Sequence, residues 1–127
     1  MARMSELPAW ERQHHLDKTR DLPDFGPTPF APGPPLENRR VAIVTTSGLH
    51  VHVDRPFQMG SPDYRVIPVE TPPGDLRMSH ISVNFDRSGF QEDVNVVFPL
   101  ERLRELEAEG DIGSIADFHY SFMGAAP

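Results

Sequence analysis

Three segments of this sequence contain histidines at spacings that could support acid–base or metal chemistry. The first is His50-Val51-His52-Val53-Asp54. If this segment is extended, the two histidines and the aspartate project from one face, because side chains alternate along a strand. Two imidazoles on one face can chelate a metal ion, although a stable site needs further donors. The alternative is a pair of histidines on a solvated face.

The second segment is Ser79-His80, followed by Asn84 and Asp86. The run Met78–Phe85 alternates between apolar and polar residues, which predicts a strand with His80 and Asn84 on its polar face. Asp86 continues the alternation, so His80 could act as a general base beside a carboxylate or complete a metal site. The alternative is an ordinary half-exposed strand whose polar side chains face water.

The third segment is His119-Tyr120-Ser121-Phe122-Met123-Gly124. It predicts a last strand in which His119 either forms a local hydrogen bond in the core or lies beside His50 or His80. The predicted catalytic residues are therefore His50, His80, Asp86 and His119. The predicted ligands of a divalent metal ion are His50, His52, His80 and His119.

A fourth group of candidates follows the apolar run Val41–Val44. This run of mostly β-branched residues is preceded by charges and followed by Ser47-Gly48, which predicts a buried strand in a parallel arrangement. Ligands bind beyond the carboxyl ends of the strands in open α/β sheets. The predicted cofactor-binding residues are therefore Thr45, Thr46, Ser47 and Gly48.

Two further elements would support these segments. The run Tyr64–Pro68 predicts a short strand. Pro99 suits the first turn of a helix, Gly110 suits its end, and Leu100, Leu103 and Leu106 form one apolar stripe between them. We therefore expect an α/β domain with a small sheet and flanking helices, in a flavodoxin-like or three-layer arrangement.

The composition excludes several classes of protein. A length of 127 residues fits one domain, and the absence of cysteine excludes disulfides, thiolate metal centres and a cysteine nucleophile. The net charge of −7 argues against nucleic acid as a partner. No apolar run approaches the ~20 residues of a membrane span, and the N-terminus lacks the apolar core of a secretory signal. We therefore expect a cytoplasmic protein that binds neither nucleic acid nor a membrane.

Proline and charge divide the chain into an N-terminal arm and a body. Seven of the 14 prolines lie in residues 1–40, whose net charge is zero, whereas residues 41–127 contain six basic and 13 acidic side chains. We expect residues 1–38 to form a helix after Ser5 and a Pro-rich arm, and residues 39–127 to form the α/β domain. The arm is either a flexible linker or an extended strap with three apolar anchors, Trp10, Phe25 and Phe30.

Several motifs occur here in a characteristic order: Val41–His50, Arg55-Pro56-Phe57, Tyr64–Pro68, Ser79-His80, Asn84–Asp86, Asp93–Pro99, Gly110–Gly113 and His119–Gly124. Together they resemble the B subunit of the glycine/sarcosine/betaine reductase and D-proline reductase family, the selenoprotein B family. The resemblance covers roughly residues 39–124 and does not include the arm.

The resemblance implies reductive cleavage of a C–N bond in an amino acid or its N-methylated relative. In that family a selenocysteine or cysteine of the B subunit carries out the redox step, and a partner subunit supplies a carbonyl group. That redox residue lies downstream of the motif matched by His119–Gly124, and this sequence continues for only three residues after Gly124. The chain therefore resembles the upstream half of such a subunit. The pocket implied by the resemblance consists of Thr45, Thr46, His50, His80, Asp86 and His119.

Three functions follow as hypotheses. In the first, the chain is one subunit of a heteromeric enzyme that acts on a small amino-acid-like substrate, and a second polypeptide supplies the missing redox half. In the second, it is a stand-alone lyase or hydrolase with a His/Asp site, with or without a metal ion. In the third, it is a non-catalytic binding or scaffold module, because a shared fold does not determine function.

Overall fold

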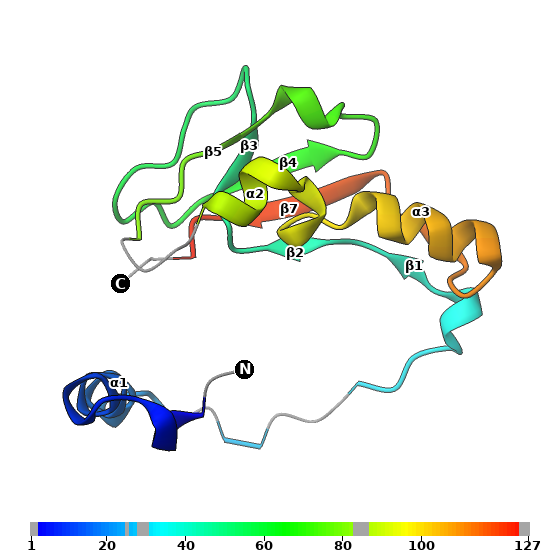
Figure 1. The fold of residues 1–127 in the computed structure, drawn as a ribbon. Coiled ribbons are helices and arrows are strands. Elements are labelled where there is room, and N and C mark those ends of the chain that lie inside the picture. The colour runs from blue at the N-terminus through cyan, green and yellow to red at the C-terminus, as the bar shows by residue number, and fades with distance from the viewer. Residues whose placement is uncertain (1–2, 25, 28–30, 83–86, 125–127) are drawn as a thin grey trace. The chain divides into compact units, whose positions relative to one another are not determined.

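The chain divides into two units, Met1–Pro32 and Gly33–Pro127, in the computed structural model, which describes residues 3–24, 26, 27, 31–82 and 87–124 (Figure 1). In the first unit, the 3₁₀ helix η1 (Met4–Glu6) precedes helix α1 (Ala9–Arg20), so the helix predicted after Ser5 is confirmed. No side chain of α1 is buried, and Trp10 is 73% exposed. The strap stays a prediction, because its anchors Phe25 and Phe30 lie outside the described residues.

The described part of the second unit contains three small sheets with helices beside them, which confirms the predicted α/β class (Figure 1). Strand β7 lies between β2 and β4, parallel to the first and antiparallel to the second, while β1 pairs with β6 in parallel and β3 with β5 in antiparallel. The strands are β1 (Arg40–Val41), β2 (Val44–Thr45), β3 (Leu49–Val51), β4 (Tyr64–Pro68), β5 (Leu76–Met78), β6 (Ser114–Ile115) and β7 (Phe118–Phe122). The helices are η2 (Leu36–Asn38), η3 (Pro73–Asp75), α2 (Ser88–Glu92), η4 (Val94–Val96) and α3 (Leu100–Glu109).

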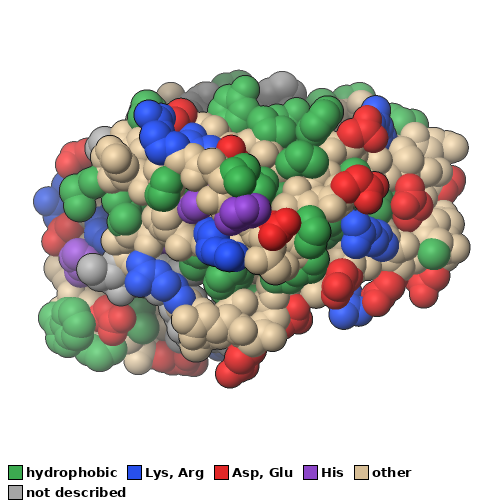
Figure 2. Space-filling model, turned by 90° about the horizontal axis from the view of Figure 1, so that it is seen from above, with side chains coloured by type: hydrophobic (Ala, Val, Ile, Leu, Met, Phe, Trp, Pro, Cys, Tyr) green, Lys and Arg blue, Asp and Glu red, His purple; other side chains and the backbone are tan. Residues whose placement is uncertain are grey.

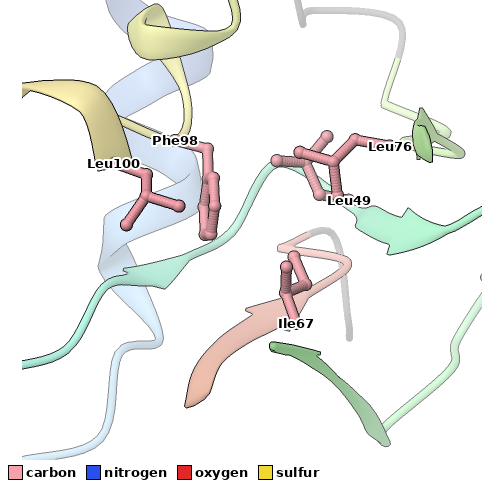
Figure 3. Close-up of a cluster of buried hydrophobic side chains, with 5 residues drawn as sticks. All are labelled: Leu49, Ile67, Leu76, Phe98 and Leu100. Atoms are coloured by element: carbon pink, nitrogen blue, oxygen red, sulfur yellow. The ribbon is translucent and has the colours of Figure 1, made fainter. Parts of the chain in front are cut away.

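The core of the second unit is one cluster of apolar side chains contributed by strands and by the start of α3 (Figure 3). Leu49 of β3 and Ile67 of β4 are fully buried, and each contributes about 1.5–3 kcal/mol to stability through the apolar surface removed from water. The remaining members of the cluster are Leu76, Phe98 and Leu100. The core thus joins β3, β4 and β5 to α3.

The predicted helix over Leu100–Glu109 is confirmed as α3. Pro99 is its N-cap, and Gly110 ends it in the left-handed conformation at φ 81°. Leu100 is buried, whereas Leu103 and Leu106 are half-buried along the same stripe. Among the described residues, no helix has the length and apolar character that crossing a membrane requires.

The strand predicted from Val41 onward differs from the structure in its burial. It forms two short strands, β1 and β2, and each lies in a parallel pair as expected. The predicted burial is wrong, because Ala42 is exposed and Val44 is 65% exposed. The reason is that β2 is the edge of a three-stranded sheet of which only one face is covered by the core.

The strand predicted over Met78–Phe85 is wrong for its described part. β5 ends at Met78, and Ser79–Ser82 form no strand. His80, predicted on a polar face, is 7% exposed, because its backbone packs directly against Gly48. The rest of the prediction, including Asn84 and Asp86, lies outside the described residues.

We expect alanine at Gly48 to destabilise the second unit more than alanine at Gly60. Both glycines have left-handed backbone angles, φ +69° and φ +73°, which cost an L residue about 1–2 kcal/mol. A Cβ at Gly48 would lie 2.9 Å from the backbone nitrogen of His80, whereas a Cβ at Gly60 meets no atom within 4 Å. Gly48→Ala should therefore cost about 2–4 kcal/mol in urea unfolding and Gly60→Ala about 1–2 kcal/mol. Equal losses would contradict the close approach at Gly48.

Candidate functional site

Residues Thr45–Gly48, which comprise the last residue of β2 and the turn that leads to β3, present hydroxyl groups both inward and outward. We call this segment the 45–48 turn. The Thr45 and Ser47 hydroxyls are buried and lie 2.8 Å apart, and the Ser47 amide donates to Thr45 Oγ1 over 3.3 Å. Thr46, between them, is exposed. The turn therefore holds two hydroxyls in a fixed geometry and offers a third to solvent.

Two other segments hold the 45–48 turn in place. The Gly48 amide donates to the carbonyl of Phe122 over 2.9 Å, and the Gly48 carbonyl accepts from the Ser79 amide over 3.0 Å. Gly124 packs so closely that a Cβ there would lie 2.3 Å from the Thr46 carbonyl oxygen. The end of β7 and the segment Ser79-His80 thus meet the predicted cofactor-binding residues, although they are distant in sequence.

His80 is held in one tautomer by its backbone partner. The Ser82 amide donates to His80 Nδ1 over 3.1 Å, so in the neutral ring Nε2 carries the hydrogen. Burial lowers the pKa of His80 below its usual 6.5, and the positive charge of Arg87 lowers it further. Arg87 also donates to the His80 carbonyl. His80 is therefore a neutral ring at pH 7, packed against the 45–48 turn.

His119 is the second residue of β7 and is fully buried. Its Nδ1 accepts a hydrogen bond from the Ile43 amide over 3.0 Å, and its ring meets Phe98 edge to face at 5.3 Å. Burial lowers the pKa of His119 below 6.5, with a smaller contribution from Arg104. Its Nε2, which carries the hydrogen, has no hydrogen-bond partner among the described residues. The hydrogen bond predicted for this ring is thus present, but it is long-range rather than local.

His50 and His52 occupy different environments. His50 is buried in β3, and its Nδ1 donates to the Val51 carbonyl over 2.8 Å, which leaves Nε2 as the acceptor. β3 ends at Val51, so His52 lies beyond the strand. The His52 side chain is 48% exposed, with Nδ1 3.6 Å from the Asp75 carboxylate. The two rings therefore differ in exposure, one buried within the strand and one half-exposed beyond its end, and the shared face stays a prediction.

The four histidines predicted as metal ligands, His50, His52, His80 and His119, are not gathered into a metal site by the described residues. No group of three or more His, Cys, Asp or Glu side chains in that part of the chain is placed to hold a metal ion. The tautomers also matter, because His80 and His119 use Nδ1 as an acceptor and carry the hydrogen on Nε2. A metal at Nε2 would require the loss of that hydrogen. The pairing predicted for His80 with Asp86 lies outside the described residues.

A row of buried polar side chains on the inward face of the β2-β7-β4 sheet was not predicted from the sequence. Arg65 of β4 and Thr45 of β2 both face Ser121 of β7 across the ladder. Arg65 donates to the Arg55 carbonyl and to Asp63, and its guanidinium lies 4.4 Å from the centre of the Phe57 ring. Arg65 Nη2 and Ser121 Oγ have no partner among the described residues.

One signal in the sequence could have identified this row. Arg65 lies two positions before Ile67 in an otherwise apolar strand. Because side chains alternate along a strand, the two residues occupy the same, inward-facing set of positions. The hydrogen bond from Arg65 also lowers the pKa of the Asp63 carboxyl. An arginine in such a position needs several acceptors, which Arg55 and Asp63 provide.

These features define an α/β domain whose polar interior consists of hydroxyl groups, histidines and one buried arginine, with no thiol. The chain belongs to the glycine/sarcosine/betaine reductase selenoprotein B family, whose model matches residues 21–127. The resemblance stated from the sequence is therefore confirmed. The match also includes the part of the arm that follows Arg20.

Individual relatives support the same family. The chain is 34% identical over 90 residues to D-proline reductase subunit gamma of Acetoanaerobium sticklandii. This alignment covers 70% of this chain and 36% of that protein. It is 35% identical over 100 residues to the betaine reductase complex component B subunit beta of Peptoclostridium acidaminophilum, covering 74% and 22% of the two chains. The sarcosine reductase complex component B subunit beta of that organism is 31% identical over 112 residues, covering 81% and 25%.

The matches cover a much larger share of this chain than of its relatives. The chain spans between about a fifth and just over a third of the length of these curated relatives. No solved structure gives a significant match. These relatives are named as subunits, and two of them as components of reductase complexes.

We expect the second unit to lose stability as the pH falls below about 6.5. His80 and His119 have lowered pKa values in the fold, so the unfolded chain binds protons more readily than the folded chain. The stability linked to these rings is therefore complete above the unfolded pKa and declines as the pH falls toward the folded values. Urea unfolding at about pH 7.5 and at about pH 5.5 measures this loss.

The variant His119→Asn measures how much of the pH dependence of stability comes from the His119 ring. Asparagine offers an acceptor near the position of Nδ1 for the Ile43 amide but does not titrate. We expect His119→Asn to reduce the difference in unfolding free energy between the two pH values. The matched control is His14→Asn, because His14 is exposed in α1. An unchanged pH dependence in His119→Asn would contradict the role of burial at this ring.

Proposed function

We propose that this chain is a subunit of a heteromeric cytoplasmic reductase and that it binds a small amino-acid-like substrate. The observation that carries the proposal is membership of the reductase B family by a chain without cysteine. A thiol or selenol that reduces the substrate therefore comes from outside these 127 residues. The relatives' names, which describe subunits of D-proline, betaine and sarcosine reductases, support a partner subunit.

The substrate class follows from the chemistry that those names have in common. D-Proline, betaine and sarcosine each combine a carboxylate with an amine or ammonium nitrogen on the adjacent carbon. A carboxylate is recognised by hydroxyl and N–H donors, and such hydrogen bonds to a charged group are worth about 1.5–3 kcal/mol each. The 45–48 turn, with the exposed Thr46 hydroxyl, supplies a donor of this kind. We therefore assign carboxylate binding to this turn.

The reaction proposed for the complex is reductive cleavage of the C–N bond. The bond breaks, the carbon gains a hydrogen, and the nitrogen leaves as an amine. The two electrons come from a dithiol or a selenol–thiol pair of the partner, which becomes oxidised to a disulfide or selenenyl sulfide. The residues of this chain bind and orient the carboxylate while the partner carries out the redox step.

The test is an assay of the complex isolated through a tag on this chain from its native cells. With a chemical dithiol as reductant, we expect the complex to release methylamine from sarcosine, trimethylamine from betaine, ammonia from glycine, or the ring-opened amino acid from D-proline. Release of product by the isolated 127-residue chain alone would overturn the proposal in favour of a stand-alone enzyme. The absence of turnover and of any co-purifying redox subunit would favour a binding or scaffold module.

We expect Thr46→Val to lower kcat/KM of the complex by about 10- to 100-fold, because it removes a hydroxyl at nearly constant shape. The effect should appear mainly in KM, since a carboxylate contact is present before and during the reaction. Thr19→Val is the matched control, because Thr19 lies in α1, where its hydroxyl bonds only locally to the Leu16 carbonyl. Equal activities of the two variants would show that the 45–48 turn does not bind substrate.

A further inference from the structure

One face of the β2-β7-β4 sheet consists of exposed apolar and aromatic side chains. We call it the aromatic face. Its six members are between 37% and 65% exposed and come from all three strands: Val44, Tyr64, Val66, Phe118, Tyr120 and Phe122. Contiguous apolar surface of this kind on a protein is typical of an interaction site.

The register of the strands makes the aromatic face continuous. Tyr120 faces Val44 on one side and Val66 on the other, and Tyr64 faces Phe122. The ring centre of Tyr64 lies 5.8 Å from that of Tyr120 and 5.7 Å from that of Phe122. The rings therefore form one packed surface rather than a set of separate exposed side chains.

The charged and polar residues of the same strands lie on the opposite side. Arg65, His119 and Ser121 alternate with members of the aromatic face and are buried. The aromatic face thus has no charged side chain of its own strands at its centre, which is the composition of an interface core. The two tyrosine hydroxyls add a polar group to an otherwise apolar surface, as in many protein interfaces.

Helix α3 has the opposite character on its outer surface. Figure 2 shows acidic side chains gathered toward the α3 end of the molecule, and the exposed residues of α3 include Glu101, Arg102, Arg104 and Glu105. Arg102 and Glu105 form an ion pair on that surface. Because α3 is charged and solvated outward, the aromatic face is the better candidate for a partner.

The fold indicates what covers the aromatic face. The sheet is mixed, because β7 pairs with β2 in parallel and with β4 in antiparallel. Parallel pairing occurs mainly in α/β sheets whose two faces are both covered, usually by helices. The core covers only one face here. Between just under two thirds and almost four fifths of the length of each curated relative lies outside its match to this chain. That additional length is sufficient to supply a covering layer.

We propose that the aromatic face packs against an apolar helix face of the polypeptide that carries the remaining part of the reductase B family sequence. This inference rests on the proposed function, because it identifies the redox partner as the occupant. The partner helix presents aliphatic or aromatic side chains to Tyr120 at the centre of the face. The contact buries the three aromatic residues of β7 together with Tyr64.

The occupant is identified by photo-crosslinking in the native cells. A benzophenone amino acid replaces Tyr120 in the tagged full chain, and the crosslinked peptide is sequenced by mass spectrometry. We expect a peptide from a polypeptide that matches the family outside the region aligned with this chain. The same substitution at Val53, which is 76% exposed and outside the aromatic face, should not produce that crosslink. A crosslink to a second copy of this chain, to an unrelated protein, or to nothing would overturn the proposal.

The variant Tyr120→Lys tests the energetics of the contact. A charge at the centre of an apolar interface should lower the recovery of the family polypeptide on the tagged chain by at least about tenfold. Val53→Lys is the matched control and should leave the recovery unchanged. Far-ultraviolet circular dichroism and a urea midpoint near that of the unmodified chain show that Tyr120→Lys is folded. Undiminished recovery with a folded Tyr120→Lys variant would overturn the proposal.

The outcomes separate this inference from the proposed function. Reductive turnover by the complex, with a crosslink from Tyr120 to a second copy or an unrelated protein, contradicts the docking inference alone. A crosslink to the family polypeptide, with no turnover of any of the four substrates, contradicts the proposed function alone.

Discussion

The position of β7 between β2 and β4 is the constraint on which the rest of the second unit depends. Because side chains alternate along a strand, β7 must place His119 and Ser121 on one side of the sheet and Phe118, Tyr120 and Phe122 on the other. The same strand pairs with β2 in parallel and with β4 in antiparallel. The side chains of both neighbours are therefore divided between the same two faces of the sheet. One strand thereby determines both the polar interior of the unit and its apolar outer face.

The polar interior has a definite electrostatic character. His119 lies in a small apolar core beside Phe98, where a positive ring would lose hydration without gaining a counter-charge. The backbone amides of Ile43 and Ser82 donate to Nδ1 of His119 and His80, respectively, and both interactions favour neutral rings. Arg65 is the exception among the buried ionisable groups, because Asp63, the Arg55 carbonyl and the Phe57 ring compensate its charge. These groups suit hydrogen bonding and orientation better than the assembly of a metal site.

The features that were predicted correctly from the sequence are determined by residues close together along the chain. α3 was predicted correctly, because Pro99, the leucine stripe and Gly110 act within the helix itself. β4 was predicted correctly from its short β-branched run. The family was identified because it is defined by the order of motifs along the chain, which needs no tertiary information.

The errors concern contacts between distant segments. The burial of Val44 depends on what covers the sheet, and no residue near Val44 carries that information. The alternation after Met78 resembled a strand, but β5 ends at Met78, and the His80 backbone packs closely against Gly48, which is distant in the sequence. The face shared by His50 and His52 was predicted for an extended segment, and it stays a prediction because β3 ends at Val51, between the two residues.

The hydrogen bond from the Ile43 amide to His119 joins residues 76 positions apart, which has a consequence for how the chain folds during synthesis. β2 and β4 are not neighbours in the sheet, and among the described residues each pairs only with β7. The ribosome therefore releases both strands before the strand that joins them exists, and the sheet forms only after residues 118–122 have emerged. Such non-local pairing slows folding, because the chain loses the conformational entropy of closing a long loop before the strand contacts stabilise it. In the interval, β2 and β4 lack the strand with which each of them pairs in the folded unit.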